Sequence, residues 1–200
     1  MKGQTLLLAS TNQGKLAEIR QALAPLGWSV VDPSTHPIGE VEEDGATFVA
    51  NAVKKATTAA RATGLPTLAD DSGLVVDALG GAPGVVSARF AALEGAGVGD
   101  AANNTLLLHK LEGLPQDQCT ARFICALALV WPDGRTVTAE GVVEGYILKA
   151  PRGGNGFGYD PLFFVPELGC TTAELSKEEK NRISHRGRAI RMLVAKLEGL

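Results

Sequence analysis

The chain has 200 residues, of which 45% are hydrophobic and 20% are charged, and its formal net charge is −3. This composition suits one globular domain spanning residues 1–200 and argues against disorder. The slight negative charge excludes the generally cationic surface that nucleic-acid-binding proteins usually show. The three cysteines form no Cys-x-x-Cys pair, which favours thiols in a reducing compartment. The first apolar run, Leu6–Ala9, is too short for a signal peptide or a membrane span. We therefore expect a cytoplasmic protein that binds neither nucleic acid nor membrane.

Hydrophobic periodicity predicts that strands and helices alternate along the chain. In the first half we expect a strand at Thr5–Ala9, a helix through Leu16, Ile19 and Leu23, a strand at Trp28–Val31, and a long helix at Thr47–Thr63 that stops at Gly64. In the second half we expect a helix at Ala101–Leu111 capped by Asp100, followed by strands at Arg122–Trp131, Thr136–Ile147 and Leu162–Val165. A capping box at Ser176–Glu179 should open another helix, and the last helix is expected at Ala189–Leu197. The two long strands surround a Pro-Asp-Gly-Arg turn. The pattern predicts an α/β fold with a mixed central sheet, a long antiparallel hairpin and flanking helices.

The segment between the first strand and the first helix is rich in polar groups that suit a phosphate chain. Backbone N–H groups at a helix N-terminus point outward and favour anions. The segment is not a Walker A motif, and ordinary helix capping explains the same residues. They are Ser10, Thr11, Asn12, Gln13, Gly14 and Lys15.

Carboxylates gather at two places in the chain. The first is a loop ahead of the long helix, with Glu40, Glu42, Glu43 and Asp44. These side chains form either a solvated acidic loop or ligands for Mg²⁺, which prefers hard oxygen donors. The second is Asp70-Asp71-Ser72-Gly73, which we expect to form a turn between two apolar strands. Two adjacent carboxylates in apolar surroundings repel each other, and a cation relieves that cost, so we favour a functional role over a purely structural turn.

The C-terminal part adds a glycine-rich loop and a basic segment. Four glycines surround Phe157 between Gly153 and Gly158, where the aromatic ring is either a stacking surface for a base or the anchor of a flexible loop. From Ser176 onward, seven Lys and Arg residues stand against three Glu residues. This local positive charge suits an anionic ligand, although a solvated helical face explains any single lysine equally well. Among other cations, we favour Arg89 and Arg152 over Lys54 and Lys55 as ligand contacts.

Six stretches together resemble the Ham1 family of inosine triphosphate pyrophosphatases, in the family's order and over nearly the whole chain. They are Ala9–Lys15, Glu42–Phe48, Ala69–Leu74, Gly80–Gly84, Gly156–Pro161 and Ser184–Gly187. The resemblance implies the ITPase-like (Maf-like) fold and hydrolysis of ITP, dITP and XTP to the nucleoside monophosphate and pyrophosphate. It also implies Mg²⁺ as the cofactor, a nucleoside triphosphate as the substrate partner, and a homodimer.

The resemblance also implies roles for individual residues. It makes Asp71 the catalytic base and a metal ligand, with Glu42 and Glu43 as the acidic pair that supports the metal, and Ser72 a substrate contact. Phe157 is implied to stack on the base. The further substrate contacts implied are Ser10, Thr11, Asn12, Gln13, Gly14, Lys15, Gly158, Tyr159, Asp160, Lys180, His185 and Arg186. Asp70 is expected to be a supporting residue for this site.

Two other functions fit parts of the pattern. One is a Maf-type pyrophosphatase that acts on modified pyrimidine or methylated nucleotides, against which the Phe157–Asp160 and Ser184–Arg186 stretches argue. The other is a non-catalytic nucleotide-binding regulator, which has little use for two adjacent carboxylates beside a triphosphate.

Overall fold

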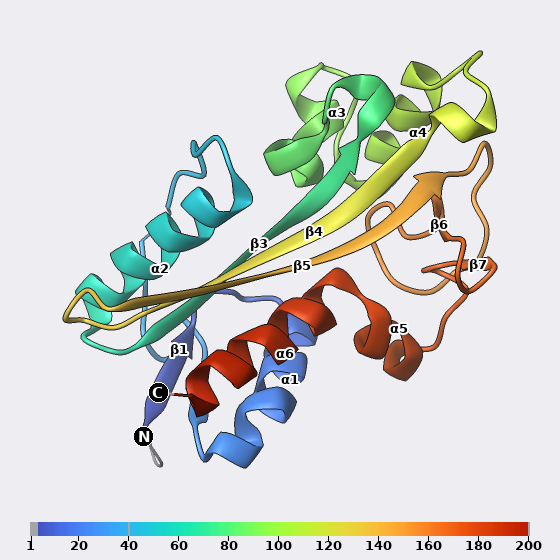
Figure 1. Cartoon of the computed structure of the whole chain (residues 1–200). Helices are drawn as coiled ribbons and strands as arrows, with labels where there is room; N and C mark the ends of the chain where they lie inside the picture. Colours follow the sequence, from blue (N-terminus) through green and yellow to red (C-terminus); the bar gives the residue numbers. More distant parts are fainter. Residues whose placement is uncertain (1–3, 40, 200) are drawn as a thin grey trace. The chain divides into compact units, whose positions relative to one another are not determined.

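A computed structural model describes residues 4–39 and 41–199, and in this part of the chain seven strands form one mixed sheet in the order β2-β1-β3-β4-β5-β6-β7 (Figure 1). The strands are β1 (Thr5–Leu8), β2 (Ser29–Val31), β3 (Thr67–Val76), β4 (Thr120–Val130), β5 (Thr136–Ile147), β6 (Phe163–Val165) and β7 (Cys170–Thr171). The α-helices are α1 (Gln13–Leu23), α2 (Phe48–Thr63), α3 (Phe90–Leu93), α4 (Gly99–Lys110), α5 (Lys177–Ile183) and α6 (His185–Glu198). Short 3-10 helices cover Ala24–Leu26, Asp77–Leu79, Gly84–Arg89 and Gln116–Gln118.

The sheet combines parallel and antiparallel pairs. Strand β1 pairs in parallel with β2 and β3, whereas β6 pairs antiparallel with β5 and β7. Strands β4 and β5 are neighbours joined by a tight turn, in which the Trp131 N–H donates to the Arg135 carbonyl at 2.9 Å. The predicted α/β fold, with its mixed sheet, long hairpin and flanking helices, is confirmed.

The chain divides into two compact units. The first contains Met1–Asp71, Cys125–Gly141 and Arg186–Leu200, and the second contains Ser72–Ile124 and Val142–His185. The boundaries fall within β3, β4 and β5, and within α6 directly after its first residue, His185. The assignment of residues 1–200 to one domain stays a prediction.

The core of the first unit lies between the sheet and helices α1 and α6. Leu6 and Leu8 of β1 share one face of the strand, because side chains alternate along it, and they pack in one cluster with Leu16, Ile19 and Leu23 of α1. The 3/4 spacing of these α1 residues puts them on one side of the helix. Helix α2 covers the opposite face of the sheet with a buried stripe of alanines (Figure 1). Side chains of β3 that point to opposite faces therefore meet different helices.

The second unit has its own core, built on the outer halves of the long strands. Leu74 and Val76 of β3 join Phe123 of β4, Phe163 of β6 and Leu107 of α4 in one buried cluster. The rings of Phe123 and Phe163 lie 4.6 Å apart between centroids. This core supports the loop between β5 and β6.

Two local predictions were wrong. The segment Asp70–Gly73 is not a turn but the middle of β3, which runs on as the neighbour of the long strand β4 and is held extended despite turn-forming residues. Asp100 does not cap a helix, since α4 begins at Gly99 and Asp100 lies within its first turn. The last helix also begins earlier than expected, at His185.

Other details agree with the prediction. Thr47 caps α2 by accepting from the Ala50 N–H, and Gly64 ends it in the left-handed conformation. Ser176 and Glu179 form the predicted capping box at the start of α5. In the described part of the chain, no helix has the length and apolar character needed to cross a membrane.

Candidate active site

The two adjacent carboxylates of β3 lie on opposite faces of the sheet. Asp70 faces α1 and α6, where it forms ion pairs with Lys15 and with Arg186, whose Nε lies 3.0 Å from Oδ2. The thiol of Cys125 donates to the same oxygen at 3.4 Å. Only 2% of the Asp70 side chain is exposed. Burial opposes ionisation, but the Lys15 and Arg186 charges outweigh it and hold the pKa of Asp70 well below its usual range. Asp70 is therefore a buried anion that fixes two cations.

Asp71 faces α2, where a buried amide holds its carboxylate. Asn51 is 1% exposed, and its Nδ2 donates to Asp71 Oδ2 at 3.0 Å. The other end of the amide, Oδ1, accepts from the Gly45 N–H at 2.7 Å. A side chain on Gly45 would place its Cβ 2.5 Å from that oxygen, which explains the glycine. Asn51 thus ties the acidic loop to Asp71.

The surroundings of Asp71 favour its protonated form more than water does. Burial raises the pKa of Asp71 most, and the negative charges of Glu43 and Asp70 raise it further. The Asn51 hydrogen bond and the Lys55 charge act in the opposite direction without cancelling this effect. A carboxylate with a raised pKa suits a general base, because its proton affinity is closer to what catalysis at neutral pH requires.

The acidic loop brings one of its two predicted metal-supporting residues towards Asp71. Glu43 is half-buried, acts electrostatically on Asp71, and forms an ion pair with Lys55. Glu42 is exposed. Glu40 lies outside the described residues.

The carboxylates Asp71 and Glu43 fit a Mg²⁺ ion shared with a phosphate chain. Within residues 4–39 and 41–199, no group of three or more His, Cys, Asp or Glu side chains is placed to hold a metal. Mg²⁺ in nucleotide enzymes is usually bound through one or two carboxylates, with water and substrate phosphates supplying the other ligands. Asp71 and Glu43 provide two oxygen donors, and their mutual repulsion is a cost that a divalent cation relieves. The metal role of Glu42 stays a prediction.

The predicted phosphate-binding segment connects β1 to α1. Asn12 caps the helix, since its Oδ1 accepts from the Lys15 N–H at 3.1 Å, and Ser10 Oγ accepts from the Asn12 N–H at 3.2 Å. Helix capping is therefore confirmed, and the cap does not use the N–H groups of the exposed residues Gln13 and Gly14. Phosphate binding by this segment stays a prediction. The exposed members of the segment are Thr11, Asn12, Gln13 and Gly14.

The glycine-rich loop of the second unit presents an aromatic ring beside a cation. Phe157 is 56% exposed, and the Lys180 Nζ lies 4.9 Å from the centroid of its ring. The buried Asp160 accepts from the Phe157 N–H at 2.8 Å and from Thr172 Oγ1 at 2.8 Å, and it forms an ion pair with Lys180. A side chain on Gly156 would place its Cβ 2.1 Å from Asp160 Oδ2. One buried carboxylate thus fixes both the ring and the cation.

Three further predicted contacts have mainly structural surroundings. Tyr159 is buried in the core of the second unit, where its hydroxyl donates to the Ser87 carbonyl at 2.8 Å, and burial raises its pKa. His185 stacks on Phe123 with centroids 4.8 Å apart. Arg186 is buried in the first unit. Their roles in substrate binding stay predictions.

No motif of the sequence pointed to Asn51, and Arg152 was expected to contact a ligand in preference to Lys55. Arg152 pairs with Glu174 at 3.0 Å, whereas Lys55 pairs with the acidic loop. A signal for Asn51 was present, because its position falls on the buried stripe of α2 with Ala52 and Ala56. A polar side chain on such a stripe needs a partner, and here that partner is the catalytic candidate.

The comparisons with known proteins agree with this geometry. Residues 6–196 match the sequence profile of the Ham1 family. A dITP/XTP pyrophosphatase from Desulforamulus reducens is 57% identical, with 93% of this chain and 92% of the relative covered. A dITP/XTP pyrophosphatase from Thermus thermophilus is 50% identical, with coverages of 97% and 92%. The solved structure of a HAM1 protein from Coxiella burnetii is similar with a TM-score of 0.91 and 43% identity, covering 98% of this chain and 100% of that one. The chain belongs to the Ham1 family.

Proposed function

We propose that the protein hydrolyses deaminated purine nucleoside triphosphates, namely ITP, dITP and XTP, to the nucleoside monophosphate and pyrophosphate. The observation that carries the proposal is the buried Asp71, whose pKa is raised and whose carboxylate is oriented by Asn51 beside Glu43. The names of the relatives, dITP/XTP pyrophosphatase, support the same reaction. Such a reaction removes these nucleotides before they enter DNA or RNA.

In this proposal Asp71 acts as the general base. Its carboxylate accepts a proton from the attacking water, while the Asn51 amide keeps one oxygen occupied and so fixes the direction of the other. Asp71 and Glu43 are the residues that would hold Mg²⁺, which when bound neutralises phosphate charge. The exposed N–H groups at the start of α1 favour the phosphate oxygens, and Lys15 adds a positive charge beside them.

The second unit supplies the groups proposed for the base. The exposed ring of Phe157 offers a stacking surface, and such stacking is worth roughly 1–3 kcal/mol per base. The Lys180 ammonium beside the ring has donors only. It can pair with the 6-oxo group of hypoxanthine or xanthine, whereas the 6-amino group of adenine offers no acceptor there. This difference is our physical basis for discrimination against ATP.

Three finer statements belong to the proposal. We propose Mg²⁺ as the physiological metal and a homodimer as the assembly, the latter resting on the resemblance alone. We also propose a cytoplasmic location, which rests on the cysteine pattern of the sequence. Sedimentation velocity tests the dimer, because a monomer of 20.8 kDa and its dimer are readily separated.

One assay separates the proposed function from its rivals. The protein is incubated with Mg²⁺ and, separately, ITP, dITP, XTP, GTP, ATP and dUTP, and released pyrophosphate is measured. We expect rapid release from ITP, dITP and XTP only. Release from dUTP in preference to ITP would favour the Maf-type reaction. No release from any nucleotide would favour a binding protein without catalysis.

A further inference from the structure

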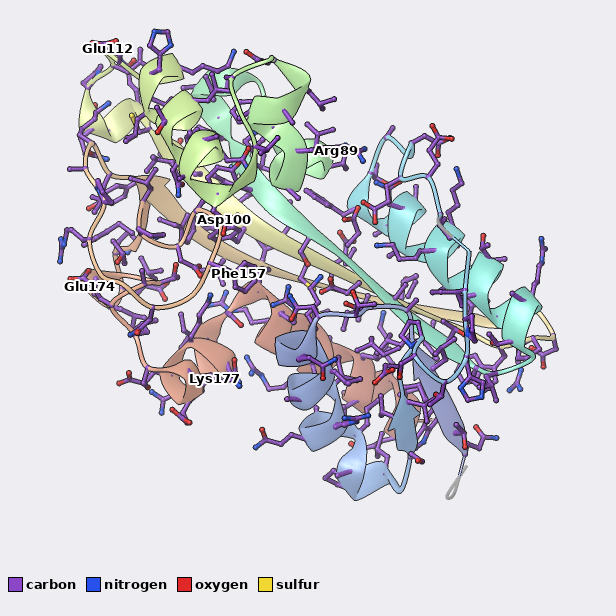
Figure 2. All side chains as sticks on the ribbon, turned by 180° about the vertical axis from the view of Figure 1, so that it is seen from behind. Arg89, Asp100, Glu112, Phe157, Glu174 and Lys177 are labelled. Carbon is purple, nitrogen blue, oxygen red and sulfur yellow. The ribbon has the colours of Figure 1, made fainter. Side chains whose placement is uncertain are left out.

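The loop that carries Phe157 is fastened to helix α4 through both polar groups of one residue. The Gly158 N–H donates to Asp100 Oδ2 at 2.6 Å, and the Gly158 carbonyl accepts from Asn104 Nδ2 at 2.9 Å. Asp100 and Asn104 are four positions apart, so they lie one turn from each other on the same side of α4. Figure 2 shows Asp100 and Phe157 on these neighbouring segments. We call the two contacts the Gly158 clamp.

The clamp acts on the peptide bond that carries the ring. The N–H of Gly158 belongs to the peptide group that begins at the Phe157 carbonyl, so Asp100 fixes the plane of that group. On the other side of the ring, Asp160 accepts from the Phe157 N–H at 2.8 Å. The backbone of Phe157 is therefore held at both ends. Because more than half of the side chain is exposed, the ring has limited packing of its own, and its position depends on this backbone.

Neither clamp residue uses its side chain for the helix to which it belongs. The N-cap of α4 is Val98, which makes no side-chain capping bond, although Asp100 is close enough in sequence to be expected as a cap. The amide nitrogen of Asn104 holds the loop, whereas its amide oxygen is buried without a hydrogen-bond partner among the described residues. A buried polar atom without a partner lowers the stability of the folded state. Both side chains are thus directed at the loop.

We propose that Asp100 and Asn104 are positioning residues that pre-organise Phe157 for stacking on a purine base. This inference rests on the role given to Phe157 under the proposed function. A ring held in advance loses less freedom on binding, so affinity for a base is gained without any new contact to it. Ligands that lack a base gain nothing from the clamp.

The test compares a ligand with a base and a ligand without one. Dissociation constants for IMP and for pyrophosphate, each with Mg²⁺, are measured by calorimetry for the wild type, Asp100→Ala, Asn104→Ala and Asp100→Asn. We expect each alanine variant to bind IMP about tenfold more weakly, the effect of one lost positioning hydrogen bond, and pyrophosphate within about twofold of the wild type. Asp100→Asn keeps an acceptor oxygen and should restore most of the IMP affinity.

Two controls separate positioning from general damage. Thr105→Ala, on the same helix, removes a hydroxyl whose one bond to the described residues goes to the Ala101 carbonyl of α4, and it should change neither constant. Hydrogen exchange in the absence of nucleotide should show a faster Gly158 amide in Asp100→Ala. If thermal unfolding shows that one alanine variant does not fold, the other alanine variant still tests the positioning role through its affinities for IMP and pyrophosphate.

Every outcome bears on the inference. Equal weakening of IMP and pyrophosphate, unchanged IMP binding, or a wild type that does not bind IMP would overturn it. Its failure is distinguishable from failure of the proposed function, because hydrolysis of ITP by the wild type is measured separately. An enzyme that hydrolyses ITP but binds IMP equally well with and without the clamp contradicts only this inference.

Discussion

Replacing Asp70 by asparagine removes the anion that holds Lys15 and Arg186. The two side chains of the Asp70–Arg186 pair are 2% and 8% exposed, so the substitution leaves a guanidinium uncompensated in a largely dry environment. Removing one partner of a buried ion pair costs about 3–5 kcal/mol. Lys15 is more exposed and can turn to solvent, so it adds little. Domains of ordinary stability have roughly 5–15 kcal/mol in total, and the predicted loss is therefore a large fraction of it.

Urea denaturation at pH 7 measures this loss. With a slope of about 2–3 kcal/mol per molar urea, the midpoint should fall by roughly 1–2.5 M. A second substitution, Arg186→Met, in the Asp70→Asn background removes the orphaned charge and should recover part of the stability. Asp133→Asn is the matched control, because its pair with Arg135 is exposed, and its midpoint should not move. A midpoint for Asp70→Asn equal to that of the control would show that the Asp70–Arg186 pair does not contribute this stability.

Two further predictions concern the site. Asn51→Ala removes the amide that orients Asp71 and ties down the acidic loop, so kcat/KM for ITP should fall about 10- to 100-fold. The binding of Mn²⁺, followed by electron paramagnetic resonance, should also weaken. Unchanged values of both quantities would contradict the orienting role of Asn51. Phe157→Ala removes the exposed ring and should raise KM for ITP about 5- to 100-fold with little change in kcat. Phe157→Trp keeps an aromatic ring and should retain most of the affinity. A fall in kcat at constant KM in Phe157→Ala would speak against stacking.

Local patterns predicted regular elements well where neighbours in space did not compete with them. The predicted strand Thr136–Ile147 has the same limits as β5, and Thr47 and Gly64 end α2 as their residue types suggest. The Asp70–Gly73 segment has the composition of a turn, yet it continues β3 as the neighbour of the long strand β4. Such pairing depends on segments distant in sequence, and no local pattern contains it.

The candidate site was likewise predicted only in part from local sequence patterns. The sequence pattern singled out the Asp70-Asp71 pair and Phe157, because adjacent carboxylates in apolar surroundings and an aromatic ring among glycines are unusual in themselves, and the family resemblance then implied Asp71 as the base. It did not reveal that Asp70 holds the phosphate-segment lysine, Lys15, because that ion pair joins residues 55 positions apart. It also assigned Asp100 to helix capping, which is the usual use of an aspartate before a helix, and only the folded chain shows it bound to the Gly158 loop.

The role of Asp71 as the catalytic base is tested by the substitution Asp71→Asn. The asparagine has the same shape but cannot accept the proton, so pyrophosphate release from ITP with saturating Mg²⁺ should fall by at least about 1,000-fold. The variant should keep a cooperative thermal unfolding transition, which shows that the loss is chemical and not structural. Near-normal turnover by a folded Asp71→Asn variant would contradict the account.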